Sequence, residues 1–428
     1  MIYRQLPEWG RIGFGDCSDT IPEAAAARLA AVASRSPLPG RNGEGILEFR
    51  RNDLRVRGVV GVIAAPGCQL EVLPKIEALG EQEADAATLR RRLVHMLSLT
   101  RDLRIEALTS AELGWQKDTL LEILIRIFCQ KMMDAVRQGM PRRYIGQEED
   151  LAALRGRLDV TRQFSTLAAA PQRLACQYHE LSADIALNQV MKAAIRKLSG
   201  LATASDTQRS LRELSFAYAD ISDIPVSALR WDQIVLDRSS QRWGDLLALA
   251  QLLLGERYQT TSTGVTQGHA LLFEMNVLFE AYVSRLARRA LAGSRLRVRS
   301  QGGRKACLYE ESKGLFQTRP DILVTEEAEV RVIIDTKWKR IAPQIDDPKQ
   351  GINQGDVYQL MAYAQLYDCP RVVLLYPHHA RLGSECYQRL YHIGLDGPAR
   401  LCVATLDVSS PHAVVTAHLE RLVRAQAS

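Results

Sequence analysis

Two short segments carry the acidic and basic side chains whose spacing best supports catalysis. Residues 319–324 read RPDILV and residues 332–339 read VIIDTKWK. Each contains an apolar run typical of a strand, and the acidic stretch 326–329 between them predicts a tight turn. Asp335 and Lys337 are two residues apart, so on a strand they project from the same face. The pattern therefore predicts a hairpin that carries a carboxylate and an amine side by side.

A second carboxylate joins this pair if the two strands are antiparallel. Pairing about the acidic turn would place Asp321 opposite Ile334, beside Asp335. Two carboxylates can bind Mg²⁺ or Mn²⁺, because hard cations prefer oxygen ligands. Such a metal polarises a phosphoryl group and acidifies a bound water, and Lys337 can orient that water or neutralise charge in the transition state. The combination predicts metal-dependent phosphodiester hydrolysis.

The alternative is a surface hairpin in which Asp335 and Lys337 form a weak ion pair. Against it, Val332-Ile333-Ile334 is a continuous apolar run, which indicates a strand buried on both faces. Charges in such an element are costly unless they are paired or bind a metal. The sequence therefore favours the metal site.

Three residues on predicted helices could complete this site. Gln359 and Tyr363 are four residues apart in the helical stretch 356–364, so they share a face and can point at the metal or the DNA backbone. In PD-(D/E)xK nucleases, which this order of elements resembles, an acidic residue on the corresponding helix often completes the metal shell. The resemblance makes Glu280, on a helix predicted over 271–292, a third candidate metal ligand, with Glu274 as a competitor and an ordinary surface position as the alternative.

The order helix, hairpin, helix and buried strand (371–376) resembles the PD-(D/E)xK nuclease core, and Gln-x-x-x-Tyr after the lysine resembles its RecB-like branch. The chain as a whole resembles McrC, the nuclease subunit of McrBC modification-dependent restriction systems. This resemblance rests on segments spread along the chain: LRGRL at 154–158, MNVLFE at 275–280, RPD at 319–321, IDTKWK at 334–339, VYQLMAY at 357–363 and LLYPH at 374–378. It implies an endonuclease subunit that acts on double-stranded DNA with a hexameric AAA+ GTPase, McrB, which recognises the modified base and supplies the motor.

A basic stretch precedes the predicted hairpin. Arg295, Arg297 and Arg299 alternate with apolar residues, and Arg304 and Lys305 follow. On a strand the three arginines would form one charged stripe. They are candidates for DNA phosphate contacts, which need positive charge and carry no sequence information. A solvated strand face is the equally weighted alternative.

Composition and periodicity predict a cytoplasmic multidomain α+β protein. The chain has 428 residues and a net charge of +6, with no membrane-length apolar run, no signal-peptide core and no Cys-x-x-Cys pair among its eight cysteines. We expect a β-rich module over 1–85, with a helix capped by Thr20, a mainly helical middle over 86–265 that docks the partner, and a PD-(D/E)xK nuclease domain over 266–428. The polar stretch 80–85 is the expected linker.

The chain contains no Gly-Lys-Ser/Thr, so it lacks a P-loop and any nucleotide-driven motor must be another subunit. His378 and His379 are expected in a solvated loop, not at a metal. Two other functions stay open: a non-catalytic assembly or activator subunit of an AAA+ complex with a degenerate nuclease core, and a stand-alone RecB-like repair nuclease.

Overall fold

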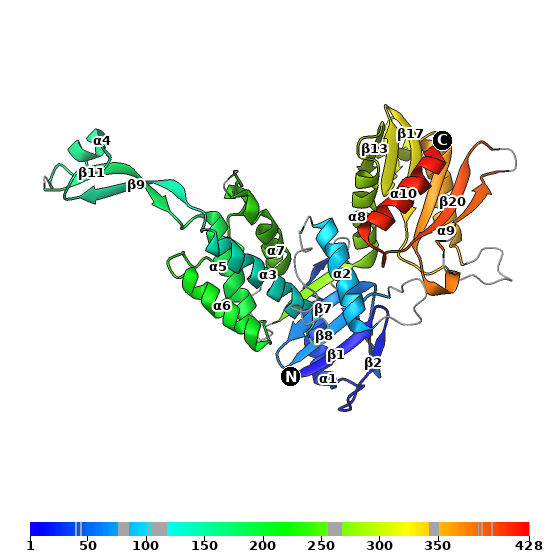
Figure 1. Cartoon of the computed structure of the whole chain (residues 1–428), viewed down its shortest axis with the longest axis horizontal. Helices are drawn as coiled ribbons and strands as arrows, with labels where there is room; N and C mark the ends of the chain where they lie inside the picture. The colour runs from blue at the N-terminus through cyan, green and yellow to red at the C-terminus, as the bar shows by residue number, and fades with distance from the viewer. Residues whose placement is uncertain are drawn as a thin grey trace. The chain divides into compact units, whose positions relative to one another are not determined.

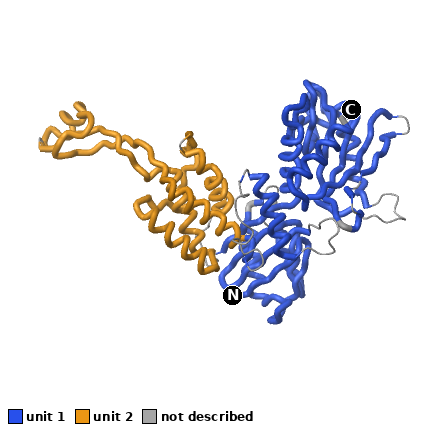
Figure 2. The backbone as a smooth tube through the Cα atoms, viewed as in Figure 1, with its two compact units in different colours: residues 1–106, 114–120, 264–428 blue, residues 107–113, 121–263 orange. Residues whose placement is uncertain are grey.

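The computed structural model of the chain divides into two compact units (Figure 2). Unit 1 consists of residues 1–106, 114–120 and 264–428, and unit 2 of residues 107–113 and 121–263. The structure describes residues 1–38, 41–42, 45–75, 85–101, 103, 118–170, 172–238, 240–255, 268–341, 351–383, 385–386, 388–394 and 397–427. Each unit is described separately below.

The first part of unit 1 is built on a four-stranded sheet in the order β1-β8-β7-β12. Its strands are β1 (Ile2–Pro7), β7 (Val59–Ala65), β8 (Cys68–Leu73) and β12 (His269–Glu274). β12 pairs antiparallel with β7, so residues about 200 positions apart in the sequence lie side by side. Gly61 permits this pairing, because a Cβ there would lie 1.9 Å from the Leu271 carbonyl oxygen. The short strands β2 (Arg11–Gly13), β5 (Leu47–Phe49) and β6 (Asp53–Val56) form a separate sheet, and β3 (Pro37–Leu38) pairs with β4 (Arg41–Asn42).

Helix α1 (Glu23–Ala33) covers this sheet, and its buried face shares one apolar core with β7 and β8. The predicted cap is wrong by two residues. Pro22 is the N-cap, and the Thr20 hydroxyl instead donates to the carbonyl oxygen of Cys17. Thr20 therefore stabilises the loop before the helix and leaves the first turn uncapped by a side chain.

The second part of unit 1 is a six-stranded sheet in the order β13-β16-β17-β18-β20-β19. Its strands are β13 (Leu296–Ser300), β16 (Ile322–Glu326), β17 (Glu329–Thr336), β18 (Arg371–Pro377), β19 (Gln388–His392) and β20 (Arg400–Leu406). The central strands β17, β18 and β20 are parallel, and their apolar runs are buried as parallel strands require. A separate two-stranded ribbon, β14 (Ala306–Glu310) and β15 (Lys313–Gln317), lies between β13 and β16 in the sequence.

Three helices pack on this sheet (Figure 1). α9 (Gln354–Leu366) shares a core with β17, β18 and β20, while α8 (Met275–Ala290) and α10 (His412–Ala427) contact each other and β17. α2 (Ala86–Thr100) packs against both α8 and β8. The helix predicted over 271–292 starts later than expected, because residues 271–274 belong to β12.

Unit 2 contains a helical body and a long hairpin. The helices are α3 (Leu120–Arg137), α5 (Ala186–Ser199), α6 (Ser205–Ala217) and α7 (Gly244–Leu254), with short 3₁₀ turns at 226–228, 231–233 and 241–243. The hairpin β9 (Arg143–Leu151) and β11 (Leu174–Ser182), with β10 (Arg157–Leu158) and α4 (Val160–Phe164) at its far end, projects from these helices in Figure 1. The sequence predicted the helices but not this hairpin.

The mixed α/β architecture predicted from the sequence is confirmed, and no helix within the described ranges is long and apolar enough to cross a bilayer. The three predicted regions stay a prediction. Their boundaries adjoin residues 76–84 and 256–267, which lie outside the described residues together with most of the expected linker.

Candidate functional site

The predicted hairpin is present, but its register differs by one residue from the predicted one. Ile322 pairs with Ile334, which puts Asp321 in register with Asp335 and not with Ile334. The cause is a β-bulge, seen as a register shift between Val324 and Thr325. A bulge adds one residue to one strand, and here it brings the two aspartates to directly opposed positions.

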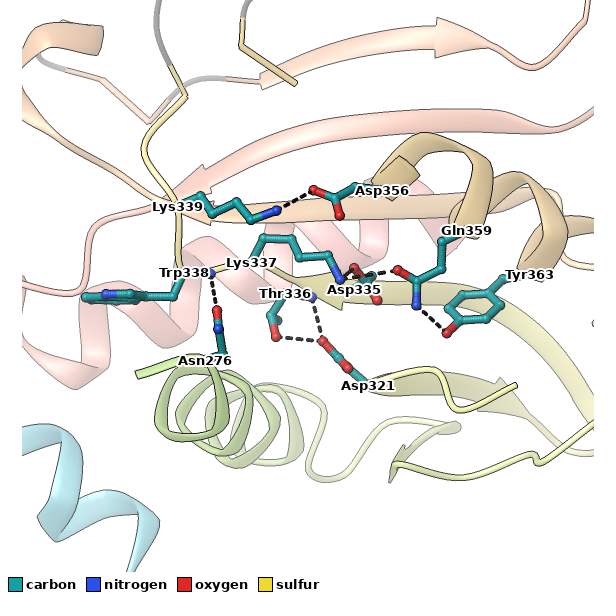
Figure 3. A network of polar contacts seen from close by, with 10 residues as sticks. All are labelled: Asn276, Asp321, Asp335, Thr336, Lys337, Trp338, Lys339, Asp356, Gln359 and Tyr363. Atoms are coloured by element: carbon teal, nitrogen blue, oxygen red, sulfur yellow. Dashed lines mark hydrogen bonds and ion pairs between the residues drawn. The ribbon is translucent and has the colours of Figure 1, made fainter. Parts of the chain in front are cut away.

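The polar side chains at the end of this hairpin form one network (Figure 3). The Asp321 carboxylate accepts hydrogen bonds from the backbone N–H and the hydroxyl of Thr336, both at 2.8 Å. The Asp335 side chain is 1% exposed, and its Oδ2 lies 2.7 Å from the Lys337 ammonium. The structure therefore places both aspartates and the lysine together, as the sequence predicted.

Helix α9 contributes the two further residues predicted for this site. The Lys337 ammonium donates to the Gln359 side-chain oxygen at 3.3 Å. The Gln359 amide in turn donates to the Tyr363 hydroxyl at 2.7 Å. Their spacing of one helical turn gives both side chains the same face. Gln359 and Tyr363 thus set the orientation of Lys337 through a hydrogen-bonded chain.

Burial and mutual repulsion perturb the carboxylates of the site. Burial first, and the nearby Asp321 charge second, raise the pKa of Asp335 to about 6, against the opposing effect of Lys337. Burial and then the charge of Asp321 raise the pKa of Glu280 to about 7, while Gln301 and Arg319 act in the opposite direction. Burial alone would lower the pKa of Lys337, but the combined effects of Asp335, Asp321 and Asp356 raise it. The raised pKa values of the two carboxyls have the sign expected of acids that are buried close to one another.

The donor set fits a magnesium ion. Among the described residues, the buried Asp335 oxygens accept no hydrogen bond of good geometry, although one contacts Lys337 at ion-pair distance. Within the described part of the chain, no three His, Cys, Asp or Glu side chains are already arranged around one ion. Mg²⁺ in phosphoryl-transfer sites keeps several waters and needs only one or two carboxylates plus substrate phosphate oxygens. Asp335 and Asp321 meet that requirement, and Glu280 is coupled electrostatically to both.

Trp338, which follows the lysine, makes contacts that its neighbours in the sequence do not predict. Its indole N–H donates to the Glu8 carboxylate at 2.8 Å, and its backbone N–H donates to the Asn276 side chain at 3.1 Å (Figure 3 shows the latter). The ring packs edge-on against Phe279. No local pattern reveals the Glu8 contact, because its partners are 330 positions apart.

The prediction for the adjacent histidines is wrong. His378 and His379 are buried, not solvated. The His378 ring bonds with the Thr405 hydroxyl at 2.9 Å and the Gly383 carbonyl at 3.2 Å, and the His379 ring bonds with the Ile341 carbonyl at 2.8 Å. These partners come from distant segments, so the sequence around the pair gave no sign of burial.

The basic stretch lies partly on one strand. Arg297 and Arg299 are exposed on β13, alternating with half-buried Leu296 and Val298, and Arg295 is exposed just before the strand. Arg304 is exposed in the segment after β13. Lys305 is tied to the fold instead, because its ammonium donates to the Leu366 carbonyl at 2.8 Å. The stripe is therefore formed by the three arginines, and their contact with DNA stays a prediction.

Comparison with solved structures identifies relatives of this fold. A chain in the refined half-complex from the tetradecameric assembly of Thermococcus gammatolerans McrB AAA+ hexamers with bound McrC has a TM-score of 0.74 at 19% identity, covering 99% of this chain and 99% of that chain. A chain in the cryo-EM structure of the Thermococcus gammatolerans McrBC complex has a TM-score of 0.54 at 22% identity, covering 68% of this chain and 88% of that chain. At these identities the likeness establishes the fold.

Comparison with curated proteins finds no match. The sequence profile of the family described as McrBC 5-methylcytosine restriction system component matches residues 54–377. That span is well over half of the chain and includes every residue of the network in Figure 3. The chain therefore belongs to the McrBC family, as the motifs of its sequence indicated.

Proposed function

We propose that this protein is the Mg²⁺-dependent DNA endonuclease subunit of a McrBC-type restriction system. The observation that carries the proposal is that Asp321 and Asp335 each adjoin the paired residues Ile322 and Ile334 at one end of the hairpin, with the Lys337 ammonium 2.7 Å from Asp335. Paired carboxylates next to one lysine suit hydrolysis of a phosphodiester bond at a metal. Family membership supports the same assignment.

Each residue has a distinct role in the proposed reaction. Asp335 and Asp321 would hold Mg²⁺ or Mn²⁺, with Glu280 as the third carboxylate. When bound, the ion supplies Lewis-acid polarisation of the phosphoryl group and an acidified water. Lys337 orients the attacking water and offsets the negative charge that develops in the transition state. Gln359 and Tyr363 hold Lys337 in place through the hydrogen bonds described above.

The proposed substrate is double-stranded DNA, and the proposed partner is a McrB-like AAA+ hexamer. The sequence has no P-loop, so nucleotide hydrolysis has to come from another chain. One of the related structures contains McrB AAA+ hexamers with bound McrC, and the other is a McrBC complex. We propose that the first 265 residues, through both the β-rich part and the helical body, dock the partner. We also propose that the complex acts in the cytoplasm.

Asp335→Asn tests the proposal with little change in shape. The chain is assayed with a McrB-like partner, nucleotide, Mg²⁺ and plasmid containing 5-methylcytosine. We expect the loss of strand cleavage, because a neutral amide is a poor magnesium ligand, while partner binding and the thermal transition stay unchanged. Asp368→Asn, at a residue with φ 50° after α9, is the matched control and should cut normally.

Two results would contradict the assignment. Cleavage by Asp335→Asn at the wild-type rate would rule out Asp335 as the metal ligand. A wild-type chain that stimulates the partner's nucleotide hydrolysis but never cuts DNA would support the non-catalytic activator instead. Efficient cutting by the chain without any partner would favour the stand-alone repair nuclease.

A further inference from the structure

The β14–β15 ribbon exposes large hydrophobic side chains for which the fold provides no cover. Leu308 is 58% exposed, Tyr309 69% and Phe316 72%. Of the strands that the structure describes, these two pair with each other alone, with Leu308 opposite Leu315. Singly exposed hydrophobics are common, but three on one short ribbon are a local concentration of the kind that marks an interaction site, although Leu308 and Tyr309, as successive strand residues, lie on opposite faces.

The base of the ribbon is fixed, although its strands are uncovered. The Thr318 hydroxyl donates to the Lys305 carbonyl at 2.8 Å, which closes the ribbon where its two strands meet the body. The same hydroxyl bonds with the buried Tyr367 hydroxyl at 2.8 Å. An isolated two-stranded hairpin is marginal in water, so this anchor keeps the exposed residues in a defined place.

Phe316 adds a local cost to that exposure. Its φ is 54°, in the left-handed region that bulky residues rarely adopt. Such conformations persist where the surroundings enforce them, and they cluster at functional sites. A residue that is both conformationally costly and 72% exposed has no role in the core of the protein.

The ribbon lies next to the proposed catalytic carboxylates in the chain. β15 ends at Gln317, four residues before Asp321, and four extended residues span at most about 14 Å. β13, on which Arg297 and Arg299 are exposed, precedes β14, the other strand of the ribbon, in the sequence. A duplex whose phosphate reached Asp321 would therefore lie within about 14 Å of Gln317, at the base of the ribbon.

The charge around the ribbon favours a nucleic acid over a protein as the occupant. Residues 295–319 contain seven Arg or Lys residues and two carboxylates, Glu310 and Glu311. Phosphates are attracted by such a local excess of positive charge. Proteins that bend DNA insert apolar side chains such as Phe and Leu between base steps, and the exposed ribbon side chains are of that type.

We propose that the β14–β15 ribbon contacts duplex DNA beside the cleaved phosphate, with Tyr309 and Phe316 packing against the bases. The neighbouring cations Arg304 and Lys313 contact the phosphates on either side. This inference rests on the proposed nuclease function and adds the surface that holds its substrate.

The test measures DNA binding separately from cutting. The double variant Tyr309→Ala/Phe316→Ala is made in the full chain carrying Asp335→Asn, and binding to a fluorescein-labelled duplex is followed by anisotropy. We expect affinity roughly ten- to a hundredfold weaker, as for the loss of aromatic contacts to bases. The salt dependence should stay the same, because apolar contacts release no counterions, whereas Arg304→Ala/Lys313→Ala should reduce it.

Phe216→Ala is the matched control, since Phe216 is 81% exposed on α6 of unit 2. It should bind DNA as the parent does. A duplex affinity of the ribbon variant within twofold of that of the parent would overturn the proposal. An equal loss of affinity in the Phe216→Ala control would overturn it too, as would a parent protein that does not bind the duplex.

Loss of partner binding or of self-association in the ribbon variant, with DNA affinity intact, would make the ribbon a protein interface and also overturn the proposal. Failure of the proposed function gives a different result: Asp335→Asn would still cut DNA, whatever the ribbon variant does in the binding assay.

Discussion

Replacing Trp338 with Phe tests how the first strand of the protein holds the segment that follows Lys337. The Glu8 side chain is 3% exposed, and its Oε1 accepts from the Trp338 indole at 2.8 Å and from the Lys75 backbone N–H at 3.3 Å. Its other oxygen has no hydrogen-bond partner within the part of the chain that the structure describes. The substitution removes the shorter of the two hydrogen bonds from a buried carboxylate.

The expected cost follows from the charge on Glu8. A hydrogen bond to a charged group contributes about 1.5–3 kcal/mol, and one between neutral groups about 0.5–1.5 kcal/mol. Trp338→Phe should therefore destabilise unit 1 by about 2 kcal/mol with Glu8 present and by about 1 kcal/mol in a Glu8→Gln background. The difference, about 1 kcal/mol, is the coupling that a double-mutant cycle measures.

The pH dependence has a definite sign. Burial is the largest influence on Glu8 and raises its pKa above the usual 4.5, against the opposing hydrogen bonds from Trp338 and Lys75. A raised pKa in the folded state means that Glu8 favours folding when protonated, below about pH 4.5, and loses that contribution as pH rises through the folded pKa. Glu8→Gln should thus gain stability relative to the wild type between pH 4.5 and pH 8.

The assay is urea unfolding of the four proteins of the cycle, followed by far-UV circular dichroism because the tryptophan itself is changed. Cleavage rates are measured in parallel, since Lys337 is the residue before Trp338. A coupling of zero, or a Glu8→Gln variant whose stability changes with pH as the wild type does, would refute the argument that a buried, charged Glu8 holds Trp338.

Three further predictions use the same structure. Lys337→Met should abolish cleavage and shift metal binding to higher pH, because the native Lys337 lowers the pKa of Asp335. Mg²⁺ affinity is measured by calorimetric titration at several pH values, and the same pH dependence as in the wild type would contradict the prediction. The wild-type cleavage rate should rise between pH 5 and pH 8 as the carboxyls with pKa values of about 6 and about 7 ionise, and a flat profile would contradict the assigned ligands. Gly61→Ala should cost at least about 1–3 kcal/mol in unfolding experiments, given φ 129° and the close Leu271 carbonyl, and it should cost more than Gly67→Ala, the control whose φ of 77° is also strained but whose added Cβ meets open space among the described residues.

The site was predictable to the extent that its residues are close in sequence. The apolar runs of β16 and β17, the acidic turn and the one-turn spacing of Gln359 and Tyr363 are all local patterns. The one-residue error in register came from a bulge, which changes the pairing without changing the alternation of apolar residues. Patterns of that kind predict that two strands pair, but not the detailed partner of each residue.

The missed elements have physical reasons as well. β9 is mostly polar and β11 begins with three successive apolar residues, so neither strand of this hairpin has the alternation that marks a half-buried sheet. β12 was included in the following helix because residues 271–273 are apolar and directly precede α8. Its partner β7 is about 200 residues away, and pairing over that distance leaves no local signal.

Long-range contacts of this kind connect the candidate site to the amino-terminal sheet. α8, which carries Glu280 and Asn276, starts directly at the end of β12, and β12 is an edge strand of that sheet. Glu8, at the end of β1, binds Trp338 through a second, independent contact. The helix that supplies the third carboxylate and the segment that supplies the lysine are thus both held from the first 75 residues of the chain. Because a misplacement of about 1 Å can cost a hundredfold in rate, we expect the amino-terminal sheet to influence the geometry of the proposed catalytic site, although its strands contain none of the proposed catalytic residues.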